Sequence, residues 1–202
     1  MLLNFLAQTI NNYHVPPFSV NESELVVIRL PNDEIGSQIK FIMIEMITRK
    51  VKNENIEVSA LFQYASHFLE NRFKSTFSPT TVGEYIKKNA RRTNPICEAI
   101  FKTDKIRPET KVKTLQGNSS RLLSVSVMLS QTNHILFDLV GVDPQGRVKI
   151  YEIVKNEVKV GGAAILFDFH DTFQNNCSKF IKVKCSEEDG IDKLGFTIKK
   201  RF

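Results

Sequence analysis

The sequence predicts an α+β protein with a mainly helical region over residues 1–105 and a mixed β-sheet domain over residues 106–202. In the first region, apolar residues recur at helical spacing. In the second, apolar and polar residues alternate, which is typical of half-buried strands. The strongest local signal is a β-hairpin over residues 134–156, because two acidic residues interrupt its apolar strands.

The N-terminal region is expected to hold one strand followed by helices. The expected elements are a strand over 25–30 and helices over 34–50, 57–73 and 78–91. Pro31 ends the strand, and Asp33 suits the N-cap of the helix that follows. Ser78 and Pro79 suit the N-cap and first helical position of the third helix.

Two helices, a short break and a Ser/Thr-led helix with a basic end resemble a helix-turn-helix. The resemblance makes residues 80–91 the recognition helix, because Thr and Lys near a helix N-terminus can reach bases or phosphates. The candidate DNA contacts in and after this helix are Thr80, Thr81, Glu84, Lys87, Lys88, Arg91 and Arg92. A plain helical bundle with a polar face is the alternative.

The formal net charge of +6 is concentrated in one segment, residues 87–113. Its basic residues are Lys87, Lys88, Arg91, Arg92, Lys102, Lys105, Arg107, Lys111 and Lys113. Three acids oppose these nine bases, so the segment alone carries nine minus three, or +6. A localised basic stretch favours phosphate binding, so double-stranded DNA is the expected partner, with Lys111 and Lys113 as further contacts. A merely solvated face is the alternative.

The hairpin has a specific expected register. Asp143-Pro144 and Gly146 predict a type I turn with a bulge, closed by Asp143 and Arg147. This register places Asp138 directly opposite Glu152, at about 4.5–5.5 Å between Cβ atoms. Because like charges there are destabilising, the pair needs a proton, a divalent cation such as Mg²⁺, or Lys or Arg from elsewhere. Alternatively, one carboxylate is solvated at an open edge.

An Asp in one strand, then a Glu and a nearby Lys in the next, resembles the PD-(D/E)XK nucleases, which include type II restriction endonucleases. The resemblance implies that Asp138 and Glu152 bind Mg²⁺, that a lysine assists the attacking water, and that the protein is a homodimer. Lys155 follows Glu152 by three residues instead of two, so it needs a bulge to reach the same face. Lys149 or a more distant lysine is the alternative.

The flanking segments agree with the αβββαβ core that this resemblance implies. The expected elements are a helix over 99–105, a strand over 122–130, the hairpin, a helix over 163–174 and a strand over 180–185. The segment over 103–120 is the expected linker, since it holds Pro, Gly, Asn and Ser with few large apolar residues.

Composition limits the remaining possibilities. No apolar run is long enough to cross a membrane, and we expect no signal peptide. Three cysteines without a CxxC pattern predict free thiols in a reducing, cytoplasmic setting. The sequence has no G-x-x-x-x-G-K-[ST] phosphate loop and no G-x-S-x-G or H-E-x-x-H motif.

Three functions therefore compete. The first is a Mg²⁺-dependent endonuclease acting on double-stranded DNA, of the type II restriction kind. The second is a non-catalytic helix-turn-helix regulator that binds DNA without metal. The third is a protein-interaction domain whose basic face is only solvated.

Overall fold

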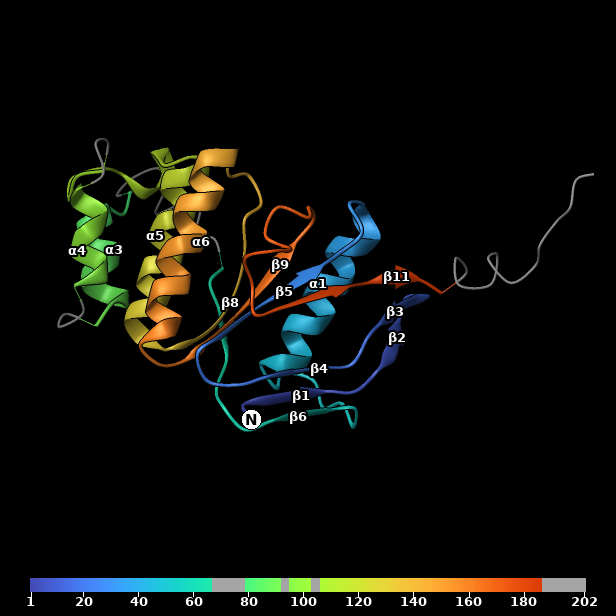
Figure 1. The fold of residues 1–202 in the computed structure, drawn as a ribbon. Helices are drawn as coiled ribbons and strands as arrows, with labels where there is room; N and C mark the ends of the chain where they lie inside the picture. Colours follow the sequence, from blue (N-terminus) through green and yellow to red (C-terminus); the bar gives the residue numbers. More distant parts are fainter. Residues whose placement is uncertain (67–78, 92–94, 103–105, 187–202) are drawn as a thin grey trace, which may run out of the picture.

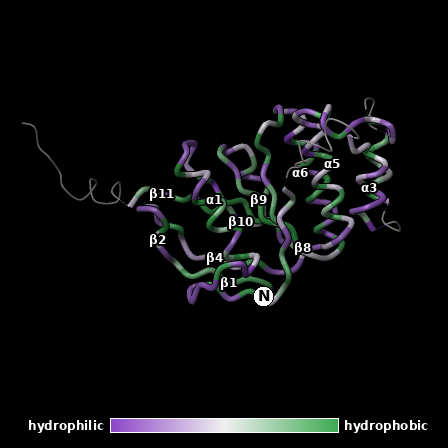
Figure 2. The backbone as a smooth tube through the Cα atoms, turned by 180° about the vertical axis from the view of Figure 1, so that it is seen from behind, coloured by the Kyte–Doolittle hydropathy of each residue, from purple (hydrophilic) through white to green (hydrophobic). Residues whose placement is uncertain are grey.

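The computed structural model describes residues 1–66, 79–91, 95–102 and 106–186. Its centre is a five-stranded sheet (Figure 1). Across the sheet the strands are β10 (Lys179–Lys182), β5 (Glu24–Arg29), β9 (Ala163–Asp168), β8 (His134–Asp138) and β7 (Gln63–Tyr64). Every neighbouring pair runs parallel. Figure 2 shows that the residues around β9 are mostly hydrophobic.

Helices cover both faces of this sheet. α1 (Glu34–Ile47) packs on one face, and α5 (Gly117–Gln131) and α6 (Pro144–Lys159) pack on the other (Figure 1). Alternate residues of a strand point to opposite faces, so Val26 joins the α1 side and Val27 joins the α5–α6 side. Because both faces are buried, the inner strands β5, β9 and β8 consist of nearly continuous apolar runs.

Two small antiparallel sheets extend the layer that contains α1. The first consists of β4 (Phe18–Val20), β1 (Leu3–Phe5) and β6 (Ile56–Val58), and the second of β11 (Lys184–Cys185), β3 (Tyr13–Val15) and β2 (Gln8–Ile10). The rings of Phe5 and Phe18 stack with their centroids 4.8 Å apart. Both belong to the same hydrophobic cluster as the buried face of α1.

A second group of helices packs on the outer side of α5 (Figure 1). It contains α3 (Val82–Asn89), α4 (Ile96–Ala99) and the 3-10 turns η1 (Ile100–Lys102) and η2 (Val112–Thr114). This group has its own small core, in which Val82 and Ile100 pack with Leu123 of α5.

The predicted hairpin is wrong, because its second strand is helix α6. Asp143 is the N-cap of that helix, and its carboxylate accepts the backbone N–H of Gly146 at 2.8 Å. Pro144 takes the first helical position, where a missing N–H costs nothing. Asp-Pro is therefore a helix start here and not a turn between strands.

Two other assignments in the C-terminal half are also wrong. The segment expected as a strand over 122–130 lies inside α5, and the segment expected as a helix over 163–174 begins with β9. In both cases a short apolar run fits either period, and packing decides the outcome. The strand expected over 180–185 is present as β10 and β11.

In the N-terminal half, the strand over 25–30 and the helix over 34–50 are confirmed as β5 and α1. The helix expected over 57–73 is wrong where the structure describes it, because β6 and β7 lie there. Its remainder lies outside the described residues, as does Ser78. The third helix is α3, with Thr81 as its N-cap.

The predicted fold class is therefore wrong. Instead of a helical N-terminal region and a restriction-endonuclease-like αβββαβ core, the chain forms a parallel α/β sheet covered by helices. Strands from both sides of the expected boundary at residue 105 pair in this sheet, since β5 lies between β10 and β9. The αβββαβ expectation failed because it required antiparallel pairing of β8 with a strand that is a helix.

Candidate functional site

The carboxyl ends of β5, β8 and β9 meet at one edge of the sheet. Asp138 is the last residue of β8, Asp168 is the last residue of β9, and the turn from β5 into α1 begins at Leu30. In parallel α/β folds, ligands bind at this edge. The residues gathered here are therefore the candidate site.

Asp138 is buried within a cluster of charged and polar side chains. Its Oδ2 accepts hydrogen bonds from Lys40 Nζ at 2.8 Å and from the Tyr64 hydroxyl at 2.5 Å. Its Oδ1 accepts one from Arg121 at 2.5 Å. Arg121 is fully buried and also donates to the carbonyl of Ala65 at 2.9 Å. Side chains from three elements, α1, β7 and α5, thus converge on one carboxylate at the end of β8.

The cluster keeps Asp138 ionised. Burial alone would raise its pKa, but the Arg121 guanidinium and the Lys40 ammonium outweigh burial and hold the pKa below its ordinary value. Burial, and then the negative charge of Asp138, raise the pKa of Tyr64, so its hydroxyl remains a donor. The carboxylate is neutralised by protein cations.

Mg²⁺ does not fit at Asp138. Mg²⁺ needs oxygen ligands with free lone pairs in near-octahedral geometry. Oδ2 already holds two donors, and Oδ1 accepts the N–H of Val140 at 3.2 Å as well as Arg121. A divalent cation there would also face the positive charge of Lys40. The described residues contain no group of three or more His, Cys, Asp or Glu able to hold a metal.

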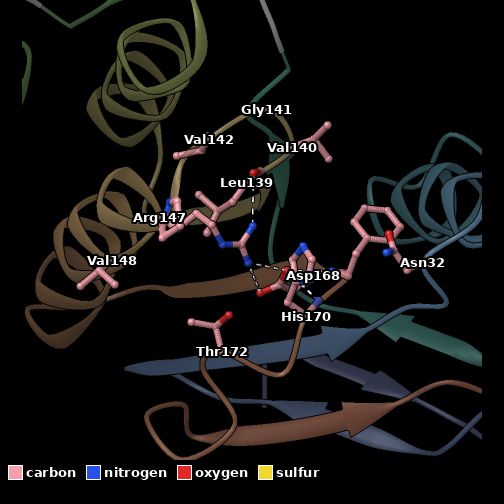
Figure 3. Close-up of a pocket in the computed structure, with 12 residues that line it drawn as sticks. Asn32, Leu139, Val140, Gly141, Val142, Arg147, Val148, Asp168, His170 and Thr172 are labelled. Atoms are coloured by element: carbon pink, nitrogen blue, oxygen red, sulfur yellow. Dashed lines mark hydrogen bonds and ion pairs between the residues drawn. The ribbon is translucent and has the colours of Figure 1, made fainter.

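Asp168 is bound just as closely by one cation. Both of its oxygens lie 2.7 Å from the same guanidinium nitrogen of Arg147 on α6 (Figure 3). Its Oδ1 also accepts the backbone N–H groups of Phe169 and His170 at 2.7 and 3.2 Å. Arg147 donates in addition to the carbonyl of Leu139 at 3.3 Å. This ion pair closes the floor of the site.

A cavity of about 610 Å³ opens over the Arg147–Asp168 pair (Figure 3). Its walls come from the loops after β8 and β9, the start of α6 and one residue of the β5–α1 turn. The lining residues are Asn32, Leu139, Val140, Gly141, Val142, Pro144, Arg147, Val148, Asp168, Phe169, His170 and Thr172. Most of these side chains are apolar, and Asn32 and His170 are exposed polar groups at the edge.

Asp33, in the turn between β5 and α1, caps the N-terminus of α1 with its side chain. Asp33 accepts the backbone N–H of Gly36 at 2.7 Å, so one of the first donors of the helix is satisfied. A Cβ at Gly36 would lie 2.0 Å from the carbonyl oxygen of Pro31, so no side chain can be placed there without moving the turn.

The structure does not bring the predicted metal pair together. Glu152 lies on α6 and is about half exposed, and its carboxylate is 4.0 Å from Lys155 Nζ one turn along the same helix. Lys155 also lies over the ring of Tyr151. Asp138 therefore belongs to the site, but Glu152 and Lys155 belong to a helix surface.

The predicted DNA contacts are dispersed over several roles. Thr80 is buried, Thr81 caps α3 through the N–H of Glu84, and Lys111 precedes η2. The residues of this set whose side chains are exposed are Lys87, Lys88, Arg91, Lys111 and Lys113. Arg92 lies outside the described residues.

The sequence did not predict five of the residues that form the site, namely Lys40, Tyr64, Arg121, Arg147 and Asp168. One signal could have located the edge: HILFD and AAILFD are both apolar runs that end in Asp. Two such runs joined by a helix predict parallel strands whose acids share an edge.

No family model and no curated protein matches this sequence. Solved structures do match the fold. One is described as the ATP binding subunit of an ABC transporter, with 14% identity and a TM-score of 0.66, covering 92% of this chain and 87% of that chain. Another is a nucleotide-free ATP-binding cassette from an ABC transporter, with 16% identity and a TM-score of 0.61, covering 94% of each chain. A third is an ATP-binding cassette in its ADP conformation, at 16% identity, 92% and 88% coverage and a TM-score of 0.63.

These similarities establish the fold and overturn the nuclease interpretation. The fold resembles ATP-binding subunits and not PD-(D/E)XK nucleases, so the predicted restriction endonuclease is wrong. The helix-turn-helix regulator is wrong for the same reason, and so is double-stranded DNA as the partner. The homodimer rested on the nuclease resemblance alone and is withdrawn with it.

Proposed function

We propose that this chain is an ATP-binding-cassette-type subunit that does not hydrolyse ATP. The fold supports the first part of the proposal, since the similar structures are described as ATP-binding subunits and cassettes of ABC transporters. The observation that carries the second part is the cluster around Asp138, in which Lys40 and Arg121 neutralise the carboxylate.

Hydrolysis in phosphate-loop ATPases depends on a specific loop and a metal. The loop G-x-x-x-x-G-K-[ST] wraps the phosphates, its Lys contacts them, and Mg²⁺ is held by the Ser or Thr and by an Asp. If Ser37 takes the last place of this pattern, the other three fixed places fall on Leu30, Ile35 and Gly36. Only the serine is of the required type.

The turn also opposes phosphate binding. Asp33 and Glu34 place two carboxylates at the N-terminus of α1, where a phosphate would need positive potential. Asp33 already uses the N–H of Gly36. Lysine at position 36 is blocked by the carbonyl of Pro31. At the N-terminus of α1, the Asp33 side chain therefore occupies a backbone N–H group that a phosphate-binding loop would offer to phosphate.

A subunit of this kind acts through assembly with other proteins. Because the similar structures are transporter subunits, we place this chain in an assembly whose other parts cross the membrane. Within its described segments, this chain has no helix that is both long and apolar enough for a membrane span.

The test is phosphate release from ATP by the purified chain with Mg²⁺ or with EDTA. We expect no Mg²⁺-dependent release above the blank from the natural chain. The Asp138→Asn variant, assayed under conditions in which circular dichroism shows it to be folded, is the control, because any activity that it retains comes from a contaminant. Mg²⁺-dependent release by the natural chain that disappears in Asp138→Asn would overturn the proposal.

A further inference from the structure

We infer that the groove between α4, α5 and α6 binds an acidic amphipathic helix of a partner protein. This inference goes beyond the proposed function, since it concerns a surface outside the candidate site. The groove has a volume of about 520 Å³, which lies within the range of sites that bind a ligand. The described residues that line it are Pro95, Ile96, Ala99, Ile100, Lys102, Leu122, Ser126, Lys149, Ile153, Asn156 and Glu157.

The groove has an apolar interior. Ile100 and Leu122 are buried at its base, and Ile96 and Ile153 are half-buried beside them. Four aliphatic side chains, one each from α4, η1, α5 and α6, thus meet along one depression. Such a surface accepts the apolar face of another helix, with anchors spaced at i, i+4 and i+7.

The groove runs along α5 and α6. Leu122 and Ser126 line it one turn apart on α5, and Lys149, Ile153 and Glu157 line it over two turns of α6. From residue 149 to residue 157 the helix rises about 12 Å, which matches about two turns of a bound helix. Cys97 of α4 donates to the carbonyl of Ser126 at 3.6 Å, so α4 is held against α5 along the groove.

The rim of the groove is basic. Lys102 and Lys149 are exposed at its edge, whereas Glu157 is half-buried. Charges at an interface rim select partners of opposite sign, so the flanks of the bound helix are acidic.

Two labelled peptides of roughly 15 residues, or about four helical turns, test this inference. Both carry Leu at i, i+4, i+7 and i+11, and one has Glu where the other has Lys at the flanking positions. Fluorescence anisotropy with the full chain is expected to show saturable binding of the acidic peptide, weakened by salt, and no saturable binding of the basic peptide.

Variants locate the binding. Ile153→Asp should weaken binding of the acidic peptide by about tenfold or more, because it places a charge on the apolar wall. Lys149→Glu should weaken it by about threefold or more. Lys159→Glu, an exposed site on α6 outside the groove, is the matched control and should leave binding unchanged.

Lys149 is exposed, so its substitution keeps the test valid even if Ile153→Asp disturbs folding. Equal binding of the two peptides, binding of neither, or equal effects of Lys149→Glu and Lys159→Glu would each overturn the inference.

Discussion

Asp138 lies at the candidate site, but the side chains that contact it differ from those that the sequence predicted. A carboxylate at the end of an apolar run requires compensation, and neutralisation by Lys or Arg was one of the alternatives that the sequence left open. The structure supplies Lys40, 98 residues away, and Arg121, 17 residues away. Neither contact has a local sequence signal, because each depends on how helices cross the sheet.

The Asp138→Asn variant is expected to lower the free energy of unfolding by about 3–5 kcal/mol at pH 7, because it leaves two buried cations unpaired. Since the folded pKa of Asp138 is lowered, its contribution is fully present above an unfolded pKa of about 3.9 and is lost as pH falls below that value. The gap between the natural chain and the variant should therefore narrow below about pH 4.

Urea unfolding at a series of pH values measures this gap. Glu152→Gln is the matched control, because this exposed carboxylate should change stability by no more than about 0.5 kcal/mol. A loss at pH 7 no larger for Asp138→Asn than for Glu152→Gln would show that the buried cluster does not stabilise the fold.

At the scale of the elements, hydrophobic periodicity and helix capping predicted some helices and strands correctly and others wrongly. α1 was predictable because Asp33 caps an amphipathic stripe, and β5 because five apolar residues precede Pro31. α5 was not, because the LLSVSVMLS run alternates like a strand while its serines donate back to helix carbonyls. Ser124 and Ser130 do so at 3.0 and 2.6 Å.

The Asp33 side chain is expected to stabilise α1 by capping its N-terminus. Asp33→Ala should lower the free energy of unfolding by about 0.5–2 kcal/mol, because the N–H of Gly36 loses its acceptor. Asn32→Ala alters the neighbouring exposed residue and should change the free energy of unfolding by less than about 0.5 kcal/mol. Urea midpoints at constant m-value measure both. Equal effects of the two variants would contradict the capping role.

At the scale of the whole molecule, the order of the strands in the sheet differs from their order along the chain. β5 comes from the first 30 residues, yet it pairs with β9 and β10 from the last 40. An order in which an early strand is inserted between two late ones cannot be inferred from local patterns. The nuclease resemblance failed for a more local reason, since it required strands where α5 and α6 are helices and a helix where β9 is a strand.

The thermal midpoint of the whole chain with and without MgATP tests the central claim most directly. A nucleotide at 100 times its Kd would add about 2.7 kcal/mol to the folded state, or roughly 5–10 °C in Tm for a chain of this size. Because Asp138 is neutralised by Lys40 and Arg121, we predict no Mg²⁺-dependent shift at millimolar ATP. A shift of this size that EDTA removes and that Asp138→Asn lacks would contradict the account.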